Sequence, residues 1–351
     1  MKNLGTSVEV LFLCYNKIMK SKRKLHNLFW PIFVTVILFF IVFFCCKWVL
    51  YAADSPAEIS SISNTENVTK DLNDFSKNNQ PCSNSDLDIG HSENSPLYFG
   101  NPSDAQNSVE SAQNYLMEKA QFTISYNNQT LNPNWVAWHL CKADLGEADR
   151  ADTFRADTEL PKNWYAVRKN DYKFPAYGFD RGHICPSADR TATKEDNNMT
   201  FLMTNMVPQS PDNNRIVWVA LEKFEREEVL KGKEAYIFAG PLDVGGTGDK
   251  GYFEAIPVSQ KDGTELFITV PAFTWKIILF LSEGEEDISR VNADCEVLAV
   301  CVPNEKGCGK NGSWQQYVCS INYIEEKTGY DFFELLPDDL EEEIENRVLT
   351  W

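Results

Sequence analysis

The sequence predicts an α+β fold for residues 97–351, and three observations indicate this class. Short runs rich in β-branched and aromatic residues, typical of strands, recur along the region. Segments with helical periodicity are few, and the longest one lies between two groups of predicted strands. Strands and helices therefore do not alternate regularly, as they would in a doubly wound parallel sheet.

The N-terminal part is organised around a long apolar run. Residues 1–28 are rich in lysine and arginine, and residues 29–53 then form an almost uncharged stretch, interrupted by Lys47. About 20 apolar residues suffice to cross a hydrocarbon core as a helix. Basic residues before the run place the N-terminus in the cytoplasm and the remainder outside. A transmembrane signal anchor and a cleaved signal peptide both fit, and the length of the run favours the anchor.

Residues 54–96 are rich in Ser, Asn and Asp and contain few bulky apolar side chains. Such a segment buries too little surface to offset the entropy lost on ordering, so we expect a flexible linker. The globular domain is expected over residues 97–351.

Within this domain, Phe122–Tyr126 alternates apolar and polar residues, as a half-buried strand does. Further strands are predicted at 135–140, 235–240, 266–270, 275–281 and 295–302. The longest predicted helix runs from Asn214 to about Lys231. Ser320 can cap a short helix that Gly329 would end, and a terminal amphipathic helix is expected around residues 340–348.

The formal charge of −18 argues against a protein whose main task is to hold a polyanion tightly. The charge is unevenly distributed, however. Residues 283–347 contain 17 acidic and 5 basic side chains, whereas residues 142–233 contain 16 acidic and 15 basic ones. The composition therefore lowers the expectation of a binding module more than that of an enzyme that releases its product.

The candidate site residues lie between Asp180 and Glu222. The stretch opens with Asp180-Arg181-Gly182-His183, continues with Asn205 and ends with Asn214 and Glu222. An imidazole, a guanidinium, amides and a carboxylate are the groups needed to hydrolyse a phosphodiester with one bound metal ion.

These motifs resemble those of the DNA/RNA non-specific endonucleases, a family that includes secreted bacterial nucleases and mitochondrial endonuclease G. The family combines Asp-Arg-Gly-His with Asn-x-x-Pro-Gln and with an Asn followed eight residues later by Glu. Here the second element begins at Asn205, and Asn214 precedes Glu222 by eight positions. The resemblance runs from about Gly100 to the C-terminus.

The resemblance implies a central antiparallel sheet flanked by helices, with a ββα unit around one metal ion, Mg²⁺ or Mn²⁺. It implies cleavage of both DNA and RNA to fragments with 5′-phosphate ends. His183 would be the general base, and Gly182 before it permits close backbone approach or an unusual dihedral. His139 lies in an apolar strand pattern, and we expect a structural role for it.

Asn214 is the expected metal ligand, with water completing an octahedral shell. Eight helical residues rise about 12 Å, so Asn214 and Glu222 cannot both hold one ion from mid-helix positions. Either Asn214 begins the helix, or Glu222 acts through metal-bound water, or both; the resemblance implies an outer-shell Glu222. It also implies that Asn205 orients the site through hydrogen bonds. Trp218 is expected to be a core residue.

Arg181 could contact phosphate or pair with a buried carboxylate, and Asp180 is expected to be a structural partner. The family also uses an upstream arginine to stabilise the pentacovalent charge, which places Arg150 or Arg155 in that role. The pattern of the secreted bacterial members favours Arg150. A surface salt bridge with a neighbouring Asp is the alternative for this residue.

The sequence contains no C-x-x-C pair, so a zinc site is not expected, whereas an external location favours disulfides. The domain has six cysteines, which allow 15 pairings: Cys141, Cys185, Cys295, Cys301, Cys308 and Cys319. A bridge at Cys185 would brace the loop after His183.

The sequence thus predicts a Mg²⁺-dependent, sugar-non-specific endonuclease that is membrane-anchored or secreted. The main alternative is an anchored nucleic-acid-binding or uptake protein of the same fold without turnover. An extracellular structural protein would explain the apolar run and the cysteines, but not the motif spacing.

Overall fold

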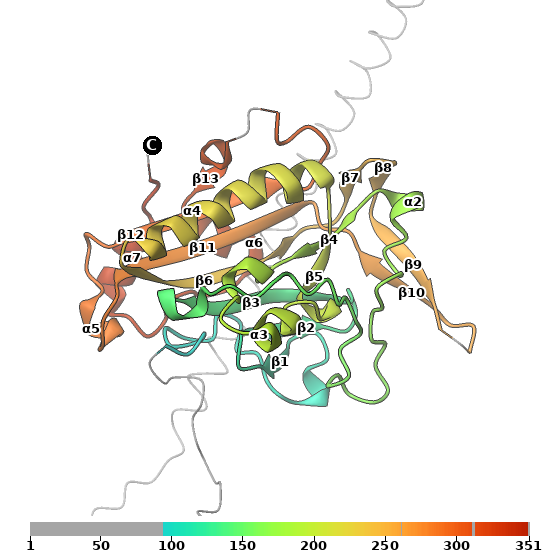
Figure 1. Ribbon diagram of the computed structural model, residues 1–351, viewed down its shortest axis with the longest axis horizontal. Helices are drawn as coiled ribbons and strands as arrows, with labels where there is room; N and C mark the ends of the chain where they lie inside the picture. Colours follow the sequence, from blue (N-terminus) through green and yellow to red (C-terminus); the bar gives the residue numbers. More distant parts are fainter. Residues whose placement is uncertain (1–93, 261, 311–312, 350–351) are drawn as a thin grey trace, which may run out of the picture. The chain divides into compact units, whose positions relative to one another are not determined.

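The computed structural model describes residues 94–349 except 261 and 311–312 (Figure 1). Its centre is a seven-stranded sheet with the strand order β1-β2-β3-β6-β11-β12-β13, and every neighbouring pair is antiparallel. The strands are β1 (Tyr115–Glu118), β2 (Thr123–Asn127), β3 (Asn132–Leu140), β6 (Lys233–Leu242), β11 (Phe273–Ser282), β12 (Glu296–Pro303) and β13 (Val318–Cys319). The predicted antiparallel α+β architecture is confirmed.

The sheet is covered by helices on both faces because its central strands are apolar on both sides. In β6, Ala235 and Ile237 belong to one core, whereas Tyr236 and Phe238 belong to the other. This is the period-two alternation of a strand buried from both directions.

The first core packs against α4 (Val219–Leu230), and the second packs against α6 (Ile321–Thr328) and α7 (Asp338–Glu345). Ser320 caps α6 by accepting a hydrogen bond from the backbone N–H of Tyr323, and Gly329 ends it in the left-handed region, as predicted. The terminal helix ends before Val348, which is half exposed.

Three two-stranded units stand beside the main sheet: β4 (Asp180–His183) with β5 (Met206–Gln209), β7 (Gly246–Gly248) with β8 (Gly251–Phe253), and β9 (Ala255–Ser259) with β10 (Glu265–Thr269). The predicted strand at 266–270 is therefore confirmed as β10, although it lies outside the large sheet. After β5, the chain enters a π-helical segment η6 (Asn213–Trp218) that continues directly into α4. The order β4, β5, η6–α4 is the expected ββα unit.

The remaining helical elements are short. The 3₁₀ turns are η2 (Val109–Ser111), η3 (Lys142–Asp144), η4 (Ser187–Asp189), η5 (Met203–Asn205) and η7 (Trp314–Tyr317). The α-helices are α2 (Phe174–Tyr177), α3 (Lys194–Met199) and α5 (Asp287–Arg290).

The basic segment 1–28, the apolar run 29–53 and nearly all of the predicted linker 54–96 lie outside the described residues. Among the residues that the structure does describe, none of the helices has the length and apolar character needed to cross a membrane.

The structure does not form the expected disulfides among the described residues. All six cysteines of the domain are free thiols. Their positions explain this result, because the sheet separates them: Cys185 and Cys308 belong to the first core, whereas Cys295, Cys301 and Cys319 pack against the second. The expected bridge at Cys185 is thus replaced by burial of a free thiol.

Candidate active site

The β4–β5 hairpin presents His183 at its end. His183 pairs with Met206, and Gly182 pairs with Val207. A Cβ atom at Gly182 would lie 2.0 Å from Oε1 of Gln209, so only glycine allows this approach of the two strands. Of the two reasons that the sequence offered for Gly182, close approach is the one that applies here.

His183 is a buried imidazole among aromatic rings. Its ring centroid lies 4.8 Å from that of Phe201 and 5.5 Å from that of Phe154. Burial foremost, and then the charges of Arg150 and Arg181, lower the pKa of His183 to about 3. The Nε2 atom has no hydrogen-bond partner among the described residues. The site therefore holds a neutral imidazole with an unpaired ring nitrogen at physiological pH.

Two arginines lie close enough to influence this imidazole. Arg181 packs its guanidinium carbon 4.2 Å from the centroid of the Phe154 ring and donates from Nη1 to the carbonyl of Lys169 (3.1 Å). Arg150 packs 5.0 Å from the Phe201 ring centroid and donates from Nη1 to Oγ of Ser187 (2.8 Å). The buried Nε of Arg181 has no protein partner among the described residues.

The structure distinguishes Arg150 from Arg155. Arg155 donates from Nη1 to the carbonyl of Asn198 (2.7 Å) and contacts Sδ of Met199 (3.5 Å), so it holds helix α3 to its own loop. Arg150 also pairs with Asp152 (2.9 Å), but both side chains are largely exposed, and such pairs contribute little. Arg150 is thus the upstream arginine whose charge acts on His183.

Asn205 braces the backbone that follows His183. Its Oδ1 accepts from the N–H of Cys185 (2.9 Å), and its Nδ2 donates to the carbonyls of Cys185 (2.8 Å) and Thr200 (2.9 Å). The side chain is fully buried, so every polar atom of this amide is used within the protein. Its contacts are those of a positioning residue.

Asn214 lies in the first turn of the helical segment that begins at Pro211, so the first of the two alternatives for its position applies. Its Nδ2 donates to Oδ2 of Asp180 (2.9 Å), and Arg215 holds both oxygens of the same carboxylate. Asp180 is thus a structural partner in this arrangement. With its nitrogen committed to Asp180, the amide of Asn214 has its carbonyl oxygen available for a cation.

The neighbouring Asn213 has a different role. It is fully buried, accepts from Gln209 (2.8 Å) and donates to Thr274 (2.9 Å) and to the carbonyl of Pro303 (3.1 Å). The π-helical turn places the two adjacent amides in different environments, one in the protein interior and one half-buried beside β4. Local π geometry of this kind occurs frequently at functional sites.

Glu222 lies in the first turn of α4 and is nearly inaccessible. Burial foremost raises its pKa to about 8, although the nearby charge of Lys276 opposes the shift. Lys276 is itself fully buried, pairs with Glu225 (2.7 Å) and lies 4.9 Å from the ring centroid of Trp218. Trp218 is completely buried, as expected of a core residue.

A pocket of about 480 Å³ adjoins Asp180 and Arg181, and the sequence reading did not identify it. Its wall contains Lys169, Lys173 and Arg215, and the exposed ring of Phe174 lies 5.9 Å from the Arg215 guanidinium. The signal in the sequence was weak: only the near-neutral balance of residues 142–233 distinguishes this region from the acidic remainder. The fold gathers its cations beside the candidate site.

Comparison with known proteins followed this geometry. The sequence model of the family described as DNA/RNA non-specific endonuclease matches residues 100–339. A protein named nuclease from Nostoc sp. is 44% identical over 252 residues, which cover 72% of this chain and 85% of that protein.

A protein named nuclease from Syncephalastrum racemosum is 31% identical over 179 residues, which cover 49% of this chain and 55% of that protein. Among solved structures, a chain from the EndoG/EndoGI complex superimposes with a TM-score of 0.54 at 20% identity. The superposition covers 70% of this chain and 92% of the other, and it shows that the fold is shared.

Proposed function

The chain belongs to the DNA/RNA non-specific endonuclease family, and we propose that it hydrolyses phosphodiester bonds of DNA and RNA with His183 as the general base and one divalent cation at Asn214. The observation that carries the proposal is the neutral, buried His183 with an unpaired Nε2. A general base must be unprotonated and must have a free lone pair directed at the proton that it removes. His183 meets the first condition over the whole physiological pH range.

The residues present suit a hard divalent cation. The carbonyl oxygen of Asn214 and the buried carboxyl of Glu222 are both oxygen donors, which Mg²⁺ and Mn²⁺ prefer. A single amide ligand leaves most of the coordination shell to water, and Glu222 would then accept hydrogen bonds from that hydration shell. When bound, such a cation neutralises negative charge on the phosphate and on the leaving oxygen.

The arginines would act on the scissile phosphate. The guanidinium groups of Arg150 and Arg181 both lie beside the imidazole, and a planar guanidinium can match two phosphate oxygens at once. The unpaired Nε of Arg181 is a donor that a phosphate oxygen would satisfy. Asn205 would keep the backbone after His183 in position by its three hydrogen bonds.

The cationic pocket would hold the strand on one side of the cleavage point. Lys169, Lys173 and Arg215 line it, and the exposed Phe174 offers a ring for base stacking. The single carboxylate in its wall, Asp180, is already paired with Arg215. An acidic protein can therefore still present a locally cationic surface to a polyanion.

Single-turnover cleavage of one short duplex by the wild type and by His183→Ala tests the assignment of the base. We expect the variant to lose about 10²–10⁴-fold in rate while still folding and binding substrate. Added imidazole should restore part of the activity, because it can fill the space left by the side chain. A folded variant within a factor of about three of the wild type would refute the general-base role.

The same material separates the proposed enzyme from a binding protein of this fold. Plasmid DNA and RNA are incubated with the protein with and without a chelator. Cleavage of both that the chelator abolishes supports the proposal. Binding of both without cleavage at any added metal concentration would favour a nucleic-acid-binding protein without turnover.

We also propose that the catalytic domain lies outside the cytoplasm, held by the apolar run at residues 29–53 or released after its cleavage. The support is the order of basic segment, apolar run and polar linker. Protease treatment of intact cells that express the full chain tests this location. Protection of the domain from the protease in intact cells, with no secreted form in the medium, would contradict it.

A further inference from the structure

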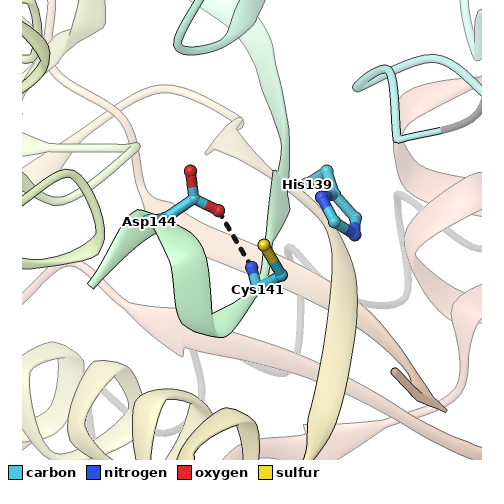
Figure 2. A group of neighbouring side chains, drawn as sticks. All are labelled: His139, Cys141 and Asp144. Atoms are coloured by element: carbon cyan, nitrogen blue, oxygen red, sulfur yellow. Dashed lines mark hydrogen bonds between the residues drawn. The ribbon is translucent and has the colours of Figure 1, made fainter. Parts of the chain in front are cut away.

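A second group of donor side chains lies at the end of β3, in a different part of the fold from the proposed Mg²⁺ site. His139 is near the end of that strand, Cys141 follows it, and Asp144 belongs to the short helix η3. One donor atom from each of the three residues lies within 4.8 Å of the other two. Figure 2 shows the sulfur of Cys141 between the carboxylate of Asp144 and the ring of His139.

Local backbone geometry explains why the three side chains meet. Residues two apart along an extended strand point to the same side, which brings Cys141 beside His139. The turn of η3 then folds back, and Oδ2 of Asp144 accepts from the backbone N–H of Cys141 (2.9 Å; Figure 2). The three residues line a pocket of about 360 Å³, so an ion could reach them.

A buried carboxylate fixes the tautomer of His139. Glu234, near the start of β6, places Oε2 at 3.0 Å from Nε2 of His139. Burial raises the pKa of Glu234, but hydrogen bonds from His139 and Arg290 outweigh burial and hold the pKa below its usual value. The ionised Glu234 can only accept, so Nε2 of His139 is the donor and the lone pair of the neutral ring is on Nδ1. A carboxylate that accepts from the far nitrogen is the usual support of a metal-binding histidine.

We propose that His139, Cys141 and Asp144 bind one zinc-like divalent cation, with Glu234 orienting the imidazole and water in the fourth position. Imidazole nitrogen, thiolate sulfur and carboxylate oxygen together suit Zn²⁺ and not Mg²⁺, which prefers oxygen alone. Zinc bonds of about 2.0–2.3 Å place tetrahedral donors about 3.5 Å apart. Small side-chain rotations would bring the observed group to that spacing.

Binding has to displace two existing partners. The thiol of Cys141 has a raised pKa, mainly through burial and also through the charge of Asp144, so binding would release a thiol proton. Nη1 of Arg190 lies 3.5 Å from Oδ2 of Asp144, a weak contact that a cation would replace. Affinity should therefore rise with pH.

The site would be structural. The backbone carbonyl of Asp144 accepts from the N–H groups of Thr191 (3.0 Å) and Ala192 (2.9 Å), so η3 is already fastened to the segment after η4. A cation would fasten it to β3 as well. The loop leading to Arg150 begins at this point, and the proposal stands independently of the proposed nuclease mechanism.

Cobalt(II) titration of the full chain, freed of metal and kept reduced, tests the proposal. Tetrahedral cobalt bound by a thiolate gives a near-ultraviolet charge-transfer band and intense visible bands, which added zinc abolishes. We expect one such cobalt per chain. Glu234→Gln should retain the band with an affinity about 10–100-fold lower.

Matched variants assign the donors. Cys141→Ser should lose the charge-transfer band, whereas Cys295→Ser, which removes another half-buried thiol, should retain it. Asn214→Ala should also retain it, which separates this site from the proposed Mg²⁺ site. Loss of the band in Cys295→Ser but not in Cys141→Ser, or absence of the band in the wild type, would overturn the proposal.

Alkylation of the unmodified wild-type chain gives a readout that does not depend on a variant folding. Zinc should slow alkylation of Cys141 and leave that of Cys295 unchanged, as measured by mass spectrometry of the corresponding peptides. Equal rates at Cys141 with and without zinc would also refute the site.

Discussion

Acidification should destabilise this protein through His183. In the unfolded chain this imidazole takes up a proton as the pH falls through about 6.5. In the folded protein, burial among Phe154 and Phe201 and the charges of Arg150 and Arg181 lower the pKa to about 3. Between these two values the unfolded state binds one proton more than the folded state, so stability falls as the pH decreases.

The structure gives the size of this effect. Each pH unit within that window costs about 1.4 kcal/mol for one group. Between pH 7.5 and pH 5.0 the window is entered at about 6.5, so His183 should account for a loss of about 2 kcal/mol. Above about pH 6.5 the residue is neutral in both states and contributes no pH dependence.

Urea unfolding of the wild type and of His183→Gln at the two pH values measures this difference. The glutamine does not titrate, while all other groups are common to both proteins. The wild type should lose about 2 kcal/mol more than the variant, with equal dependence of the unfolding free energy on urea in both. If the two proteins lose the same stability within about 0.5 kcal/mol, the imidazole is not held neutral by burial, and the reasoning about the base is wrong.

Three further outcomes are expected. Asn214→Ala should raise the Mg²⁺ concentration needed for cleavage without unfolding the protein; an unchanged metal titration would contradict the ligand assignment. The raised pKa of Glu222, about 8, means that its carboxyl must lose a proton to favour a cation, so the Mg²⁺ requirement of the wild type should fall between about pH 6 and pH 9. Glu222→Gln should show no such trend. Replacing Lys169 and Lys173 by Ala should reduce the salt dependence of duplex binding in chelator by about 0.9 per lost phosphate contact, whereas Lys327→Ala should leave it unchanged.

Local patterns were sufficient for most regular elements. The predicted strands at 122–126, 135–140, 235–240 and 275–281 correspond to β2, β3, β6 and β11, because alternation and residue type report burial directly. The predicted cap and stop of α6 are also correct. Both depend on hydrogen bonds and dihedrals within a few residues.

The short elements around the site were not found by local pattern. The strands of the β4–β5 hairpin have four residues each and contain charged or polar side chains, so they lack an apolar period. The π-helical turn has the same apolar spacing as the start of an ordinary helix. Resemblance of the motifs predicted the ββα unit, whereas periodicity did not.

The disulfide expectation was wrong for a physical reason that the sequence does not contain. Counting cysteines gives the number of pairings, but a bond requires two Cβ atoms within about 4.5 Å. The sheet places the thiols in two separate cores.

The sequence alone therefore determined the fold class, the family and the identity of the groups at the candidate site, because these follow from residue types and their spacing along the chain. Tertiary structure decided what those groups can do. The neutrality of His183, the choice of Arg150 over Arg155 and the meeting of His139 with Glu234 all depend on segments far apart in sequence. Burial and charge act through space, and the distances that control them exist only after the chain has folded.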